Sequence, residues 1–174
     1  MAEDPNSLEP DTRLIRGGLM RSSHGETSEA LYLTQSFAYE SAAGADRRFS
    51  GEDPGFIYSR YANPTTQMFE ERLALLEGAE YCRALASGMA AVHVALTGLL
   101  KAGDHLVAGR ALFGSCNWII QNWLPRFGVE TTLVDATDLK AWEDAMRPNT
   151  RVVLLESPAN PLLEITDIVA VAQI

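Results

Sequence analysis

The stretch from Tyr81 to Leu100, YCRALASGMAAVHVALTGLL, places a Ser-Gly turn between a short extended run and a helix that is apolar on nearly every side. A helix of that kind has to be buried, so the rest of the chain must fold around it. Ser87 is a favourable N-cap, and Gly88 lets the backbone approach a ligand because it has no Cβ. A helix N-terminus offers unpaired N–H groups and partial positive charge, so this turn is either a simple cap or a phosphate site.

Short apolar strands alternate with helices around this stretch. We expect strands before Ser87 and at 105–108, 129–134 and 151–155, and helices at 66–77, 88–100, 118–124, 139–146 and from 168 onward. This alternation predicts an α/β fold with a mainly parallel sheet flanked by helices. Ligands of such sheets bind at the carboxyl ends of the strands.

The N-terminal part of the chain is less regular. We expect a short helix at 11–16, an extended piece at 31–37 and a long loop at 42–55. After this loop, Tyr58, Arg60 and Tyr61 bring a guanidinium and two phenols together. They form either an anion-binding site or a surface arginine stacked on aromatic rings.

Composition limits the class of protein. The 174 residues are enough for one sizeable domain, and the net charge of −9 argues against nucleic acid and anionic membranes as partners. The sequence has no signal peptide and no long apolar run, and Cys82 and Cys116 form no disulfide framework, so we expect a cytoplasmic protein. The histidines have no metal-ligand spacing, and we expect no metal site.

Three turns are expected at the carboxyl ends of the strands: Ser87–Met89, the segment around Phe113, and Glu156–Asn160. They supply a phosphate cup, an aromatic ring that can stack on a flat ligand, and an amide for a ring substituent. Neither G-x-G-x-x-G nor G-x-x-x-x-G-K-[ST] is present, so dinucleotide and nucleoside triphosphate sites are not indicated. A phosphorylated aromatic cofactor fits these parts, and pyridoxal 5'-phosphate is the natural candidate.

Three motifs in matching order and separation resemble the Cys/Met-metabolism family of pyridoxal-phosphate enzymes: YSRYANPT at 58–65, SGMAA at 87–91 and ESPANP at 156–161. The similarity extends from about Thr12 to the last residue. RSSHGETSEAL at 21–31 and LFGSC at 112–116 are most similar to the O-succinylhomoserine sulfhydrylase branch. The resemblance implies the N-terminal part of the large domain of a fold-type I enzyme.

The resemblance also implies which residues hold the cofactor phosphate. Ser87, Gly88 and Met89 would form the cup, with backbone N–H groups of the last two bonding the phosphate. Tyr58 and Arg60 would reach the phosphate of a neighbouring subunit, which implies a homodimer or tetramer with shared active sites.

Other residues are implied to face the ring. Phe113 would stack on it where many family members have tyrosine, Asn160 would bond its 3-oxygen, and Glu156 would shape the same loop. The family's Schiff-base lysine lies in an S-x-T-K-like motif further downstream. The sequence has two lysines, Lys101 and Lys140, and neither matches that motif, so we expect no catalytic lysine in this chain.

These implications combine into one functional prediction. Residues 1–60 would contribute to a neighbouring subunit, and residues 61–174 would form a partial cofactor-binding domain. The complete enzyme would replace the succinyl group of O-succinylhomoserine with sulfide to give homocysteine, and this chain alone would be inactive. The alternatives are a cystathionine γ-synthase, a cystathionine or methionine γ-lyase of the same family, or a non-catalytic interaction module.

Overall fold

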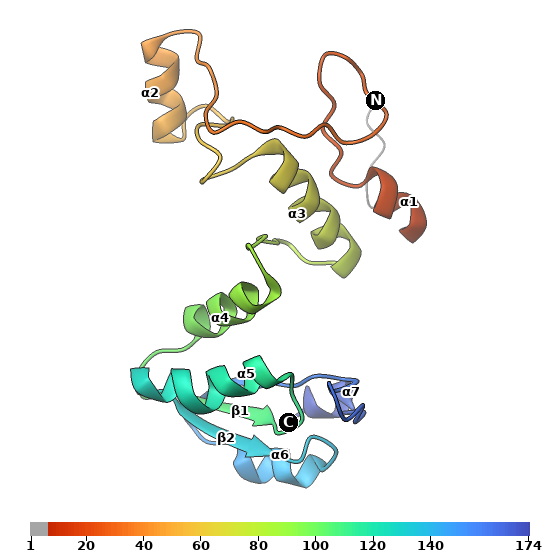
Figure 1. Ribbon diagram of the computed structural model, residues 1–174, viewed down its shortest axis with the longest axis vertical. Helices are drawn as coiled ribbons and strands as arrows, with labels where there is room; N and C mark the ends of the chain where they lie inside the picture. The colour runs from red at the N-terminus through yellow and green to blue at the C-terminus, as the bar shows by residue number, and fades with distance from the viewer. Residues whose placement is uncertain (1–6) are drawn as a thin grey trace. The chain divides into compact units, whose positions relative to one another are not determined.

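The computed structural model describes residues 7–174 and divides into two units, the first ending at Ala84 and the second running from Leu85 to Ile174 (Figure 1). None of the described helices is both long and apolar enough to cross a membrane.

The first unit holds three helices: α1 (Pro10–Arg16), α2 (Ala42–Ser50) and α3 (Pro64–Glu77). Helix α3 begins where predicted to within two residues, because Asn63 caps it by accepting a hydrogen bond from Thr65 N at 2.9 Å. It ends at Gly78, which adopts a left-handed conformation with φ of 63°. Helix α1 lies against α3, and Arg72 of α3 donates to the carbonyl of Gly17 at 3.0 Å.

Helix α2 corrects the expectation of a loop at 42–55. Ser41 caps the helix by accepting from Gly44 N at 3.0 Å, and Gly51 closes it in a left-handed conformation with φ of 82°. Arg47 and Arg48 lie in the last turn, where positive charge is favourable. Of the residues that indicated a loop, Gly51 is the C-cap of a short helix and the two arginines lie in its last turn.

The strand expected before Ser87 is also wrong. Residues 81–86 form no strand, and the backbone N–H of Ala84 donates to the Glu70 carboxylate at 2.7 Å. The expected extended piece at 31–37 is reduced to one isolated antiparallel bridge between Ser36 and Tyr58. A strand requires a neighbouring strand to pair with, and the apolar character of a segment does not supply one.

The second unit is a three-layer α/β structure. Its parallel sheet has the order β2-β1-β3, formed by β2 (Glu130–Val134), β1 (His105–Gly109) and β3 (Thr150–Leu154). The helical segments are α4 (Gly88–Leu99), α5 (Gly114–Trp118), the π-helical turn η2 (Ile119–Trp123), the 3₁₀ turn η3 (Leu124–Phe127), α6 (Leu139–Ala145) and α7 (Ile168–Val171). The α/β fold with a parallel sheet is therefore confirmed.

The two faces of the sheet bury different side chains of β1. Leu106 and Ala108 pack into a cluster with residues of α4 and η2, including Leu96 and Ile120. Val107 points to the opposite face and packs against Trp142 of α6. This alternation is the normal geometry of a strand covered on both faces, and it explains why all five residues of β1 are buried.

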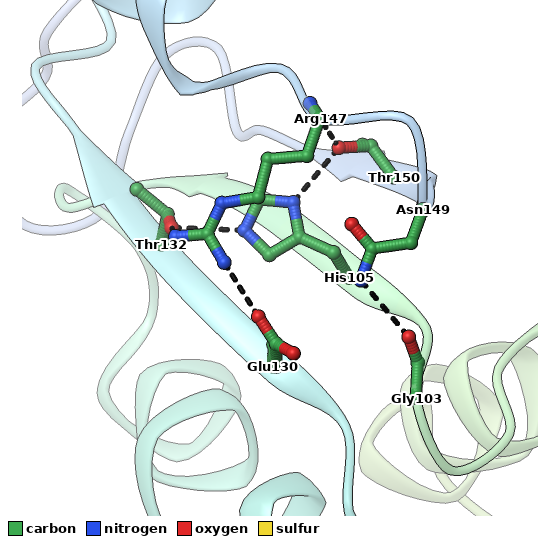
Figure 2. Close-up of polar contacts among 7 residues, drawn as sticks. All are labelled: Gly103, His105, Glu130, Thr132, Arg147, Asn149 and Thr150. Carbon is green, nitrogen blue, oxygen red and sulfur yellow. Dashed lines mark hydrogen bonds and ion pairs between the residues drawn. The ribbon is translucent and has the colours of Figure 1, made fainter.

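His105, at the start of β1, joins the three strands (Figure 2). Its side chain is fully buried, with Nδ1 2.8 Å from Thr150 Oγ1 on β3 and Nε2 2.8 Å from Thr132 Oγ1 on β2. Arg147, in the turn after α6, donates its backbone N–H to Thr150 Oγ1 at 2.8 Å and its guanidinium to Glu130 at 2.5 Å. His105 is therefore a structural residue at the amino ends of the strands.

Candidate functional site

The carboxyl end of the sheet brings together three of the residues that the sequence indicated. Phe113 follows β1, and Glu156 follows β3, which is the strand adjacent to β1. Glu156 Oε2 accepts a hydrogen bond from the backbone N–H of Phe113 at 2.9 Å, and Oε1 accepts one from the backbone N–H of Asn160 at 2.8 Å. A single carboxylate thus connects the loops that follow two neighbouring strands.

The N-terminus of α4 has the geometry of a capped helix. Ser87 is extended, with φ of −160° and ψ of 160°, and its Oγ accepts from Ala90 N at 3.1 Å. The N–H groups of Gly88 and Met89 belong to the first turn, where a helix provides no acceptor. A Cβ built on Gly88 would touch no atom within 4 Å, so packing inside the chain does not account for this glycine.

Helix α4 lies against α5 and β3. The side chains of Met89 and Cys116 both pack, partly buried, against the cluster formed by α4, β1 and η2. The cup at Ser87–Met89 and the loop of Phe113 therefore belong to one packed unit.

Tyr58 and Arg60 lie in the first unit. The Arg60 guanidinium is 5.3 Å from the ring centroid of Tyr58 and 5.3 Å from that of Tyr61, so both phenols contact the cation. Within residues 7–174 no carboxylate pairs with Arg60. Asn63 fixes this segment, because its amide donates to Tyr32 O at 3.0 Å and to Ser59 Oγ at 2.9 Å.

The charge of Glu156 also affects Cys116. Burial raises the pKa of the Cys116 thiol, and the nearby Glu156 carboxylate raises that pKa further because it disfavours a second negative charge. At neutral pH Cys116 is therefore a protonated thiol.

Neither lysine lies at Phe113 and Asn160. Lys101 stands in the turn before β1, at the amino end of the strands, and its backbone N–H donates to Asp104 at 2.9 Å. Lys140, on α6, binds both carboxylate oxygens of Asp144 at 2.8 and 2.9 Å, and this partner raises the pKa of Lys140. A raised pKa keeps the amine protonated and disfavours its use as a nucleophile.

A cavity of about 350 Å³ also opens at the amino end, away from Phe113 and Glu156. Its lining includes His93, Lys101, Trp123 and Phe127. In the described part of the chain no three His, Cys, Asp or Glu side chains gather as a possible metal site.

Fold and geometry thus define an α/β protein whose candidate site consists of a helix N-terminus and the loops after two parallel strands. Residues 11–174 match the model of the family described as "Cys/Met metabolism PLP-dependent enzyme". The chain belongs to this family, and the cofactor of the family is pyridoxal 5'-phosphate, as the sequence predicted.

Three relatives give the family context. O-succinylhomoserine sulfhydrylase of Mycobacterium tuberculosis is 49% identical over 98% of this chain and 42% of its own length. L-methionine gamma-lyase of Porphyromonas gingivalis is 44% identical over 94% of this chain and 41% of its own length. The crystal structure of metB from Corynebacterium glutamicum superposes with a TM-score of 0.88 at 35% identity, covering 98% of this chain and 43% of that one. The chain therefore spans about two fifths of the relatives it matches.

Proposed function

We propose that this chain is the N-terminal part of an enzyme that replaces the succinyl group of O-succinylhomoserine with sulfide and releases homocysteine. The observation that carries the proposal is the 49% identity with a sulfhydrylase over nearly the whole chain. Because the chain spans 42% of that relative, the activity is proposed for the complete protein. Such an enzyme of amino-acid biosynthesis would work in the cytoplasm, where thiols such as Cys82 and Cys116 stay reduced.

The residues present fit a phosphorylated ring. The first turn of α4 offers backbone N–H groups and the positive end of a 12-residue helix to a phosphate. The Phe113 side chain is 45% exposed, which leaves a ring face for stacking. Asn160 is exposed, and its amide can bond the 3-oxygen of the ring.

Each of these residues has a distinct task. Ser87 holds the start of α4, so that the N–H groups of Gly88 and Met89 converge on one oxyanion. Phe113 provides stacking and, having no hydroxyl, moves no proton. Bound pyridoxal phosphate supplies an electron sink for the carbon atoms of the substrate. The chain's own residues fix the orientation of the bound ring.

Tyr58 and Arg60 are proposed to serve the site of a neighbouring subunit. Two phenols beside the Arg60 guanidinium, and no paired carboxylate in the described chain, leave its charge for an external phosphate. This supports a homodimer or tetramer in which residues 1–60 complete the partner's site.

We further propose that the 174-residue chain alone does not turn over substrate. Lys140 is engaged by Asp144, and Lys101 lies at the amino end of the sheet, so neither lysine is placed for the reaction.

The experiment compares the purified chain with the complete protein that contains it. Both receive O-succinylhomoserine and sulfide, and homocysteine is measured. We expect product from the complete protein and none from the chain. Product from the chain would refute its proposed inactivity, and no product from the complete, cofactor-loaded protein would refute the sulfhydrylase assignment.

A second candidate is a γ-lyase, favoured by the 44% identity with L-methionine gamma-lyase. An assay of the same complete protein with methionine as substrate distinguishes the lyase from the sulfhydrylase. Elimination from methionine that exceeds homocysteine formation would favour the lyase.

A further inference from the structure

Glu156 uses both of its oxygens inside the candidate site. Oε2 accepts from Phe113 N at 2.9 Å and Oε1 accepts from Asn160 N at 2.8 Å. Phe113 precedes Glu156 by 43 residues and Asn160 follows it by four, so this carboxylate joins the loop after β1 to the loop after β3. The two residues that donate these hydrogen bonds are the ones proposed to face the cofactor ring.

The chemistry of these two contacts requires a carboxylate. Two backbone N–H groups point at the side chain, and both need acceptors. An ionised glutamate offers only acceptors, whereas glutamine would turn an NH₂ group toward one of the N–H groups. Charge-assisted bonds of this type are also stronger than neutral ones. A glutamine at position 156 would therefore keep the shape and lose one of the two connections.

We infer that Glu156 is a positioning residue, which holds the stacking ring of Phe113 and the amide of Asn160 at a fixed separation without contacting the cofactor itself. This inference rests on the proposed function. It assigns the ring alignment to Glu156 and the phosphate binding to the N-terminus of α4. Loss of Glu156 should impair the alignment of the ring and leave phosphate binding unchanged.

Cys116 supplies a reporter that does not depend on the cofactor. The thiol lies on α5, three residues after Phe113, and it senses the Glu156 charge. Removing that charge should make Cys116 form its thiolate at lower pH. Cys82, in the first unit, is an internal control thiol.

The test compares Glu156→Gln with a matched control, Glu143→Gln, which changes an exposed glutamate on α6. The first readout is amide hydrogen exchange by NMR on the chain without ligand. In Glu156→Gln at least one of the Phe113 and Asn160 amides should exchange about 10-fold faster or more, as expected for loss of a charge-assisted bond. Unchanged exchange at both amides would overturn the inference.

The second readout uses pyridoxine 5'-phosphate and inorganic phosphate as separate probes. Pyridoxine phosphate keeps the ring, the 3-oxygen and the phosphate, but it has no aldehyde to react with Lys101 or Lys140. We expect Glu156→Gln to weaken pyridoxine phosphate binding about 10-fold, to change its induced circular dichroism at saturation, and to leave phosphate affinity unchanged.

The outcomes are distinct. An equal loss of affinity for both probes would show a general structural role and overturn the positioning role. Unchanged affinity and circular dichroism would overturn it as well. A wild-type chain that binds neither probe would contradict the phosphate and ring contacts proposed for α4, Phe113 and Asn160. The homocysteine assay on the complete protein would still test the enzyme assignment, and the amide exchange would still decide whether Glu156 holds the two loops.

Discussion

The buried His105 makes the stability of the second unit depend on pH. Burial lowers the pKa of His105, and the Arg147 guanidinium lowers that pKa further, while Glu130 opposes the shift. The folded ring therefore resists protonation that the unfolded ring accepts near its ordinary pKa of 6.5. Below that pH the unfolded state binds more protons, so the free energy of unfolding must fall as the pH falls.

The size of this effect has an upper limit. If the folded ring took up no proton, one histidine would remove about 1.4 kcal/mol of stability between about pH 7.5 and about pH 5.5. Asp135 titrates outside this window, because the Thr137 hydroxyl and backbone N–H, and then Arg110, lower its pKa from 3.8. The pKa values of Cys116 and Lys140 are raised from 9.0 and 10.5, so these groups titrate above the window. Of the groups of the second unit with a shifted pKa, His105 is therefore the one that sets the slope.

Urea unfolding followed by tryptophan fluorescence measures this slope. All three tryptophans lie in the second unit, so the signal reports that unit alone. His105→Gln removes the titrating ring, and His24→Gln is the control at an exposed histidine of the first unit.

We expect His105→Gln to lower stability by about 1–3 kcal/mol at neutral pH, since it removes the two buried hydrogen bonds that the ring makes to Thr150 and Thr132. It should also flatten the decline in stability between about pH 7.5 and about pH 5.5, whereas His24→Gln should keep the wild-type slope. A His105→Gln variant that declines as steeply as wild type would refute the reasoning.

Three further predictions follow from single contacts. Ser87→Ala removes the cap of α4 and should lower the stability of the second unit by about 1 kcal/mol in the same urea assay, with Ser87→Thr restoring most of it. Cys116 should react with iodoacetamide at pH 8 more slowly than Cys82, because burial and Glu156 raise its pKa, and equal rates would contradict that placement. Trp142→Ala leaves a cavity between the sheet and α6 and should lower the free energy of unfolding by about 3–5 kcal/mol, measured by urea unfolding followed at the remaining tryptophans. A loss below about 1 kcal/mol would show that Trp142 is not in the core.

The elements that the sequence predicted well are those with local signals. Asp138 caps α6 by accepting from Lys140 N at 2.9 Å, and Asn63 with Pro64 starts α3. These helices begin within two residues of the expected positions, because capping is decided by neighbours in sequence. The failure at α2 has the same origin, since Ser41 and Gly51 are caps that a charged, glycine-containing segment concealed.

The site was predicted in part. The sequence placed Phe113, Glu156 and Asn160 at the carboxyl ends of the strands, but it did not predict that the Glu156 carboxylate binds the backbone N–H groups of the other two. The double acceptor role depends on β1 and β3 being adjacent, which no local pattern in the sequence states. The His105 network was missed for the same reason, because Thr132 and Thr150 become its partners only through the register of the sheet.

The two ends of the strands therefore separate the buried His105 network from the exposed residues that are proposed to bind a ligand. At the amino end, both ring nitrogens of His105 are paired within the sheet, so the ring offers no nitrogen to a ligand. At the carboxyl end, Glu156 takes up backbone N–H groups of the loops and leaves the side chains of Phe113 and Asn160 exposed. A polar group costs stability when it is buried without a partner, whereas the exposed amide of Asn160 is hydrated and can stay accessible at little cost. The pairing of His105 therefore stabilises the sheet at one end, while the loops at the other end carry the exposed side chains proposed to bind a ligand.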